Sequence, residues 1–317
     1  MRRYVLWRLG QALGVLWAAY TLTFFLLALL PGDPVSAMAG AGLNSGPVDP
    51  RRLDELRTQY GFDRPVLVQY VTYLGQALRG DFGDSVTTGR PVTETIADAL
   101  PQTLQLAAVA LPLAVASGTA LAMAAAWTRR PRMRQLLLSL PSLGICLPAF
   151  WVGLMLVQFL SFRIHLFPAF GNSGPAGLVL PAVTLAMPAA VLVAQVLAKS
   201  LLTALDEPYV HTARAKGAGR ERVLLHHVLR NASLPALTVV GILAGQLTAN
   251  AVVIENVFSR NGLGRVTTDA VTVQDIPVVQ GVVVFGALVF VLLNLLVDLV
   301  YPLLDPRIVT SGRRSPA

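Results

Sequence analysis

The residues best suited to contact another molecule lie in one hydrophilic segment, Asp206–Asn231, which interrupts an otherwise apolar sequence. A polar segment of this length between two apolar spans must lie in water. It contains basic residues and the small residues Ala213, Ala215 and Gly217, which would form a tip narrow enough to enter a groove on another protein. The segment therefore predicts a docking surface on which a partner acts.

The same segment predicts two short helices around a glycine break. Asp206 can cap the first helix, and Pro208 stands in its first turn, where the missing N–H costs nothing. Gly217 and Gly219 predict that this helix ends in a left-handed conformation. The second helix, Arg220–Asn231, is amphipathic. Its apolar face contains Val223, Leu224, Val228 and Leu229, and its polar face contains Arg222, His226 and Arg230.

Polar residues within the apolar spans form a second group of candidates, because polar groups at depth usually mark a pathway or a pair. Gln246 and Asn250 are four residues apart, so they share one helix face, and we expect this face to line a polar path. Gln195 and Glu255 are further candidates for this path. Glu255 and Asp298 lie near the ends of their spans, so both also fit structural acids reached by interfacial water.

Catalytic constellations are absent from the sequence. It contains no GxxxxGK[ST], HExxH, GxSxG or CxxC motif, and Cys146 is the single cysteine. His211, His226 and His227 lie in the hydrophilic segment, where we expect solvated side chains. A membrane-embedded enzyme would need a nucleophile or metal site that these residues do not form. Any energy source must therefore be another polypeptide or a gradient.

Composition identifies the class of protein that must position these residues. The chain is 54% hydrophobic and 13% charged, which is typical of an all-α integral membrane protein and not of a soluble domain. The net charge of +8 does not indicate nucleic acid, since the basic residues fall in short loops beside apolar runs.

Six apolar runs are long enough to cross about 30 Å of hydrocarbon. They are approximately Leu9–Leu30, Pro101–Trp127, Leu136–Ser161, Gly177–Leu197, Leu234–Phe258 and Val278–Leu303. We interpret the first as a retained anchor, because its apolar run exceeds the length of a signal-peptide core. The alternative, a cleaved signal peptide, leaves five spans.

The basic residues predict the orientation of the spans, because Lys and Arg collect in short cytoplasmic loops. With six spans, both termini are cytoplasmic and all four basic groups lie inside. These groups are Arg2, Arg3 and Arg8; Arg129, Arg130, Arg132 and Arg134; Lys199, Arg214, Lys216, Arg220, Arg222 and Arg230; and Arg307, Arg313 and Arg314.

The long segment Pro31–Leu100 lies outside in this scheme. Two helix-like stretches, Arg51–Tyr60 and Val66–Leu78, predict a small external cap packed on the bundle, and a disordered linker is the alternative. The apolar residues at helical spacing are Leu53, Leu56, Val66, Leu67, Tyr70, Tyr73 and Leu74.

Several motifs together carry a resemblance to a known family. The chain contains RRYVLWRLGQALGVLW at its start, LLPGDP (Leu29–Pro34), YGFDRPVLVQYVTYLGQALRGDFGDS (Tyr60–Ser85), YVHTARAKGAGRERVLLHHVLRNASLP (Tyr209–Pro235), ENVFSRNGLGR (Glu255–Arg265), DIPVVQGVVV (Asp275–Val284) and DPRI (Asp305–Ile308). This set resembles the inner-membrane permeases of binding-protein-dependent ABC importers, in particular the first permease type of the dipeptide, oligopeptide and nickel branch.

The resemblance implies a fold and a domain organisation. We expect the six-helix transmembrane architecture of type I ABC importers, with an external helical segment between the first and second spans. Residues 1–100 would form the first span and the external segment, and residues 101–305 a five-helix core that contains a coupling loop at 206–233. Residues 306–317 would form a cytoplasmic tail.

The resemblance also implies partners for particular residues. The coupling loop would dock in a cleft of a cytoplasmic P-loop ATPase through His211, Thr212, Ala213, Arg214, Ala215, Lys216 and Gly217. His211 stands where the family motif has an acidic residue. Arg214 and Lys216 would offer charge-assisted hydrogen bonds. ATP and Mg would be bound by two ATPase subunits, so the chain itself needs no cofactor.

On the outside, the loop Ser259–Val273 would face a substrate-binding protein. Its expected contacts are Asn261, Gly262, Leu263, Gly264 and Arg265. With a second permease the chain would move peptides across the inner membrane by alternating access. Nickel or metal chelates and glutathione-like solutes are alternative substrates, and a gradient-driven secondary transporter is the alternative from another class.

Overall fold

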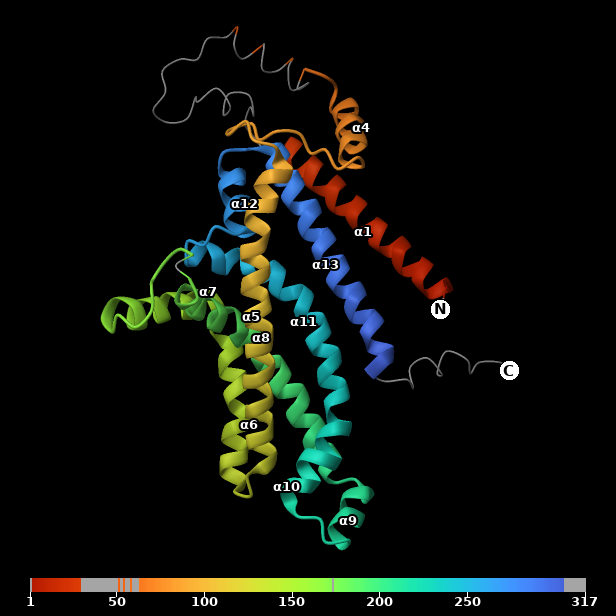
Figure 1. Cartoon of the computed structure of the whole chain (residues 1–317), viewed down its shortest axis with the longest axis vertical. Helices are drawn as coiled ribbons and strands as arrows, with labels where there is room; N and C mark the ends of the chain where they lie inside the picture. The colour runs from red at the N-terminus through yellow and green to blue at the C-terminus, as the bar shows by residue number, and fades with distance from the viewer. Residues whose placement is uncertain are drawn as a thin grey trace. The chain divides into compact units, whose positions relative to one another are not determined.

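The computed structural model describes residues 2–29, 51, 54, 58, 63–172 and 174–304. Throughout these ranges the regular elements are helices (Figure 1). They form two compact units. Unit 1 comprises Met1–Thr103 and Asn261–Val291, and unit 2 comprises Leu104–Arg260 and Leu292–Ala317. This division differs from the predicted domains, because a late segment of the chain folds with the N-terminal part.

Unit 1 combines the N-terminal part of the chain with a late segment, Asn261–Val291. Its elements are α1 (Arg2–Leu29), α4 (Val66–Ala77), the start of α5 (Val92–Trp127), α12 (Leu263–Thr272) and the start of α13 (Ile276–Leu304). Its buried core joins the start of α5 to α12 and α13 through Val92, Ile96, Ala99, Leu263, Ala270, Val278, Val279 and Val282. Gly281 permits this packing, since a Cβ there would collide with Val92.

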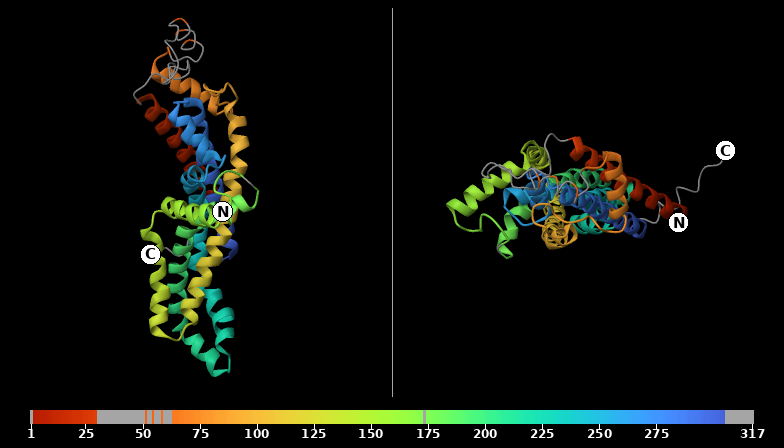
Figure 2. Two further views of the ribbon diagram at one scale, coloured as in Figure 1. Left: turned by 90° about the vertical axis from the view of Figure 1, so that its left-hand side faces the viewer. Right: turned by 90° about the horizontal axis from the view of Figure 1, so that it is seen from above.

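Unit 2 is built around two long helices, α8 (Ala176–Leu205) and α11 (Leu229–Val257), which make its most extensive helix–helix contact (Figure 2). Gly241 and Gly245 of α11 are buried, as expected for residues that allow close helix approach. The other elements are the rest of α5, α6 (Pro131–Cys146), α7 (Ala149–Leu156), a π-helical turn (Val157–Arg163), α9 (Pro208–Ala215), α10 (Arg220–Arg222) and a second π-helical turn (Val223–Val228).

The predicted spans are found with one exception. Within the described residues, four helical stretches are long and apolar enough to cross a membrane: Gly10–Leu29, Val92–Trp127, Ala176–Leu205 and Arg220–Val257. The sixth predicted span corresponds to α13, a 29-residue helix in which the stretch Ile276–Leu292 is apolar. The side chains of Asn294 and Asp298 lie outside the described part of α13.

The third predicted span, Leu136–Ser161, is not one helix. It is broken between α6 and α7, where Leu147 is extended (φ −94°, ψ 123°) and Pro148 precedes the first residue of α7. A proline ring disfavours the helical conformation of the residue before it, so Leu147 cannot continue α6. Consequently α7 leaves the line of α6 (Figure 1).

The second span also begins earlier than predicted. The helix starts at Val92, so Pro101 lies inside it instead of opening it. In the external segment, Val66–Ala77 is helical as predicted. Most of the predicted stretch Arg51–Tyr60, the LLPGDP motif after Leu29 and the tail 306–317 lie outside the described residues.

Close packing inside unit 2 gives a first testable prediction. A Cβ at Gly118 of α5 would lie 2.6 Å from the carbonyl oxygen of Ala190 in α8, and that backbone atom cannot move aside. We expect Gly118→Ala to lower the free energy of unfolding by about 1–3 kcal/mol. Thermal unfolding in detergent measures this loss. Gly286→Ala is the control, since its Cβ would meet nothing within 4 Å. Equal stability of both variants would contradict the close approach.

Candidate functional site

The start of α9 differs from the prediction in one respect. Pro208 does occupy the first helical position, but the residue before it, the extended Glu207, is the N-cap, and its side chain makes no capping hydrogen bond. Asp206 is the C-cap of α8, directly after Leu205, and does not cap α9. Only Asp206 and Glu207 therefore separate α9 from the long helix α8.

The end of α9 depends on a left-handed residue, as predicted for Gly217. Its φ is +84°. The Gly217 N–H donates to the Arg214 carbonyl (2.9 Å), and the Ala218 N–H donates to the Ala213 carbonyl (3.1 Å). These two bonds form a Schellman turn. The same prediction was wrong for Gly219, whose φ of −65° and ψ of 159° are extended.

Helix α9 is fixed to unit 2 by a small apolar base. Val210 is fully buried in a cluster with Leu201, Leu224 and Val228, and Ala213 and Ala218 pack at its edge. The remaining predicted docking residues are exposed, namely His211, Thr212, Arg214, Ala215, Lys216 and Gly217. The helix therefore presents a polar surface on an apolar support.

The predicted second amphipathic helix is confirmed. Val223, Leu224 and Val228 are buried and Leu229 is half-buried, whereas Arg222, His226 and Arg230 are exposed. The helix has no end at Asn231, since α10, the π-helical turn and α11 follow one another without a break. A displacement of this segment is thus a displacement of α11.

Arg220 makes a contact that sequence analysis missed. Its Nη2 donates to the carbonyl of Ala126 (3.4 Å), and its guanidinium lies 5.6 Å from the centroid of the Trp127 ring. Both groups belong to the last turn of α5. The arginine therefore links the hydrophilic segment Asp206–Asn231 to α5 through a hydrogen bond and a cation–π contact. A pairing across 94 positions leaves no local pattern in the sequence.

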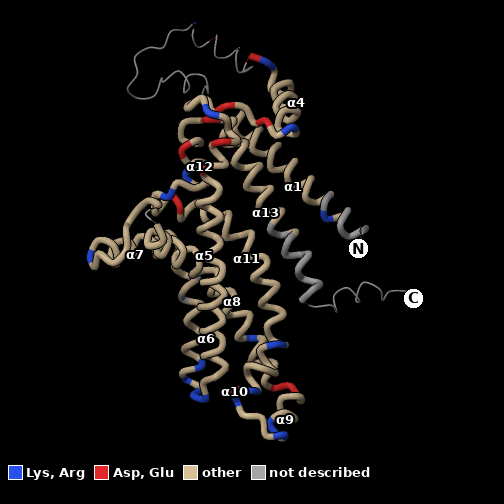
Figure 3. Tube along the Cα trace, viewed as in Figure 1, with Lys and Arg blue, Asp and Glu red and all other residues tan. Residues whose placement is uncertain are grey.

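Basic residues gather at one end of unit 2, at the connection between α5 and α6 and around α9 and α10 (Figure 3). They are Arg129, Arg130, Arg132, Arg134, Arg214, Lys216, Arg220 and Arg222. Two loops that are separate in the sequence therefore form one basic end.

The predicted path residues separate into three environments. Gln246 and Asn250 are both exposed on α11, as expected for a shared face. Gln195 is half-buried and lines a small gap between α5, α6 and α8. Glu255 is completely buried in unit 2, so neither a path-lining position nor contact with interfacial water fits it in this structure.

Glu255 instead belongs to the turn that ends α11. The Arg260 N–H donates to the Glu255 carbonyl (2.8 Å), and Ser259 between them has a positive φ of 48°. The Arg260 side chain is buried, and its Nη1 donates to the carbonyl of Gly177 at the start of α8 (3.3 Å). Burial lowers the pKa of the Arg260 guanidinium, and the Glu255 carboxylate opposes that shift.

The predicted binding-protein contacts begin in unit 1 directly after Arg260. Gly262, Leu263 and Gly264 are buried, and the Leu263 N–H donates to Thr103 Oγ1 (2.9 Å). Asn261 is exposed, and its Oδ1 accepts a hydrogen bond from Arg265 Nη1 (3.4 Å). Of these five residues, Asn261 is exposed and Arg265 is partly exposed, whereas Leu263 anchors the loop.

Asp275 is a second residue that sequence analysis missed. Its buried carboxylate accepts hydrogen bonds from Ser85 Oγ (2.6 Å) and Thr87 Oγ1 (2.8 Å). It also accepts longer bonds from the backbone N–H groups of Val86, Thr87 and Val278 (3.3, 3.3 and 3.4 Å). One side chain thus holds the loop before α5 against the start of α13.

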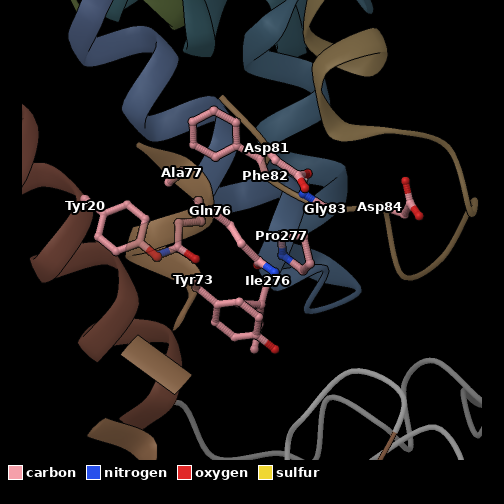
Figure 4. Close-up of a pocket in the computed structure, with 11 residues that line it drawn as sticks. Tyr20, Tyr73, Gln76, Ala77, Asp81, Phe82, Gly83, Asp84, Ile276 and Pro277 are labelled. Atoms are coloured by element: carbon pink, nitrogen blue, oxygen red, sulfur yellow. Dashed lines mark hydrogen bonds between the residues drawn. The ribbon is translucent and has the colours of Figure 1, made fainter. Parts of the chain in front are cut away.

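Beside Asp275, unit 1 contains a cavity of about 80 Å³ (Figure 4). Tyr20 of α1 enters it from one side, and Tyr73 and Gln76 of α4 lie near it. Asp81 and Ile276 are also in its lining. None of the four predicted path residues lines this cavity.

Comparison with known proteins identifies the family. Residues 118–310 match the "Binding-protein-dependent transport system inner membrane component" family, and residues 1–107 match the N-terminal region of such membrane components. A protein of Sinorhizobium fredii named a probable peptide ABC transporter permease is 36% identical over 313 residues, covering 96% of this chain and 98% of the relative.

Further relatives agree. The glutathione transport system permease protein GsiC of Salmonella paratyphi A is 37% identical over 308 residues, covering 97% of this chain and 99% of the relative. Among solved structures, a chain of the methionine ABC transporter MetNI in an inward-facing conformation superposes with a TM-score of 0.58. It is 16% identical and covers 67% of this chain and 96% of its own, so it establishes the type I importer fold alone. The chain therefore belongs to the inner-membrane components of binding-protein-dependent transport systems and is a multi-pass permease subunit of an ABC importer.

Proposed function

We propose that this chain and a second, homologous permease form the translocation path of an ATP-driven peptide importer. Relatives that match nearly its whole length are named for peptide and for glutathione transport. Glutathione is itself a small peptide derivative, so both names favour short peptides over metal chelates. An external binding protein would deliver the peptide, and two cytoplasmic ATPase subunits would supply the energy.

The observation that carries this proposal is the construction of α9. Its exposed residues His211, Thr212, Arg214 and Lys216 stand on an apolar base that includes the fully buried Val210. When a partner displaces a helix that is held in this way, the helix and its apolar support move together. The exposed cationic groups suit charge-assisted hydrogen bonds to acidic groups of an ATPase cleft.

The connections of α9 suggest how a push reaches the membrane spans. On one side, α9 follows α8 directly, and on the other the chain passes through α10 into α11. Arg220 adds a link to the end of α5. We infer that closure of the two ATPases moves α9, and that α5, α8 and α11 tilt with it to open the path to one side at a time. This is alternating access.

Orientation completes the proposal. The basic end of unit 2 would be cytoplasmic, because basic loops remain on that side. Both chain termini would then be cytoplasmic too.

Single cysteines test the orientation and the docking together. In a Cys146→Ala background, we expect Lys216→Cys to resist a membrane-impermeant maleimide in intact spheroplasts. The same cysteine should form a cross-link with the ATPase in membrane vesicles. Asn261→Cys is the control, and we expect it to react from outside. Labelling of Lys216→Cys from outside would overturn the proposal.

Reconstituted uptake tests the energy source and substrate. Liposomes containing both permeases and the ATPases, given the binding protein and internal ATP, should accumulate di- and tripeptides without an ion gradient. Uptake that required a gradient and ignored ATP would favour a secondary transporter. Uptake of glutathione or a nickel chelate in place of peptides would correct the substrate alone.

The exposed face of α11 gives a prediction about the path. We expect Asn250→Leu to raise the KM for peptide uptake several-fold while assembly with the ATPases stays unchanged, since the amide would be lost from a polar face. Ala249→Leu is the control variant, because it introduces the same leucine side chain at the neighbouring exposed position. Uptake kinetics like those of the wild type in Asn250→Leu would remove this residue from the path.

A further inference from the structure

Helix α4 has three different faces. Tyr70, Tyr73 and Ala77 form a half-buried face. Gln69, Thr72 and Gln76 follow one another at helical spacing and form a polar face. The third face is apolar and uncovered, although an external cap packed on the bundle should have buried it: Leu67 is 68% exposed, Val71 67% and, just after the helix, Leu78 81%.

The half-buried face rests on the first membrane span. The Tyr70 hydroxyl and Thr21 Oγ1 share a hydrogen bond of 2.8 Å. The Tyr70 ring stacks on Phe25 (5.6 Å between centroids) and meets Phe24 edge-on (5.4 Å). All these contacts are within unit 1. Helix α4 is therefore attached to α1 directly (Figure 1).

The position of this contact along α1 indicates how deep α4 lies relative to the membrane. Tyr20, Thr21, Phe24 and Phe25 are not at the end of the apolar stretch Gly10–Leu29 but inside its second half. At 1.5 Å of rise per residue, Tyr20 is about 14 Å along the helix from Leu29. The hydrocarbon core is about 30 Å thick. A helix that contacts α1 at this level adjoins the lipid-facing surface of the span and does not stand in water beyond it.

We propose that α4 is an interfacial helix that lies in the outer leaflet of the bilayer, with Leu67, Val71 and Leu78 in contact with lipid. This location gives each face its proper surroundings. The tyrosine face contacts α1, the apolar face contacts acyl chains, and the glutamine–threonine face contacts water and headgroups. Arg64 and Arg79, both exposed at the two ends of the helix, are placed to reach lipid phosphates.

Lipid explains the uncovered face better than a protein partner does. The apolar residues adjoin a span whose own side chains Leu22, Leu26 and Leu29 are 65%, 64% and 79% exposed, and lipid must cover much of such a span. Lipid then covers the exposed apolar faces of both α1 and α4, and no protein partner is needed to cover α4.

Spin labels at matched positions test the proposal. Single cysteines replace Leu67, Val71 and Leu78 on the apolar face, or Thr72 and Gln76 on the polar face, in a Cys146→Ala background. The labelled chain is assembled with its partner subunits in liposomes. Power saturation then compares the collision of each nitroxide with oxygen, which concentrates in lipid, and with a water-soluble nickel chelate.

We expect labels at Leu67, Val71 and Leu78 to collide with oxygen several-fold more often than with the nickel chelate, and labels at Thr72 and Gln76 to show the reverse. Frequent collision of the Val71 label with the chelate would place the face in water and overturn the proposal. Collision with neither reagent would show that a protein subunit covers it, which would also overturn it. Retained peptide uptake by each variant verifies that the labelled chains are folded.

Discussion

Gly217→Val is expected to abolish most ATP-driven uptake while leaving the chain inserted in the membrane. Gly217 has a φ of +84°, and a β-branched residue there is strained. The left-handed conformation costs other residues about 1–2 kcal/mol, which alone changes a two-state population by a factor of roughly 5–30. Relaxing this strain would break the turn bonds from Gly217 and Ala218 that end α9. Uptake in proteoliposomes and copurification with the ATPases measure the effect.

The neighbouring glycine supplies a matched control. Gly219 has a φ of −65° and a ψ of 159°, a conformation in which valine is unstrained. A Cβ at Gly219 would meet nothing within 4 Å, and the same is true at Gly217, so space does not distinguish the two positions. Gly219→Val should therefore keep nearly normal uptake. Equal loss of uptake in both variants would show that side-chain size at the tip matters and that the left-handed turn does not.

Asp275→Ala is expected to destabilise unit 1 by about 3 kcal/mol or more. The substitution removes the acceptor of the Ser85 and Thr87 hydroxyls and of nearby backbone N–H groups. Hydrogen bonds to a charged group contribute about 1.5–3 kcal/mol each, and buried donors left without an acceptor add a desolvation cost. Denaturant or thermal unfolding of the detergent-solubilised chain gives the loss. Limited proteolysis should also reveal easier cleavage near Ser85.

Two further variants test whether the buried hydrogen bonds of Asp275 account for the loss of stability. Asp275→Asn keeps one carbonyl acceptor and should lose clearly less stability than the alanine variant. Asp269→Ala removes another carboxylate of unit 1, but this one is 72% exposed and lies 3.7 Å from Arg265, so its loss should cost at most about 1 kcal/mol. Similar losses for Asp269→Ala and Asp275→Ala would mean that the buried hydrogen bonds contribute little.

The sequence by itself determined the features that depend on local pattern. Five of the six apolar runs predicted continuous helices, because hydrophobicity and length are properties of neighbouring residues. The left-handed end of α9 followed from Gly217, and the buried face of Val223, Leu224 and Val228 followed from helical spacing. The break at Leu147–Pro148 could also have been predicted from the proline, but the apolar run continues across it and was therefore interpreted as one span.

Only the tertiary structure decided which polar residues are anchors. Ser85 and Asp275 are separated by 190 positions, Thr103 and Leu263 by 160, and Gly177 and Arg260 by 83. A periodic pattern carries no information about such pairings, so Glu255 was predicted on the path although it is buried beside Arg260. The outward apolar face of α4 was hidden for the same reason. Its pattern predicts an amphipathic helix, whereas the contact of Tyr70 with the second half of the apolar stretch of α1 decides which face α4 leaves uncovered.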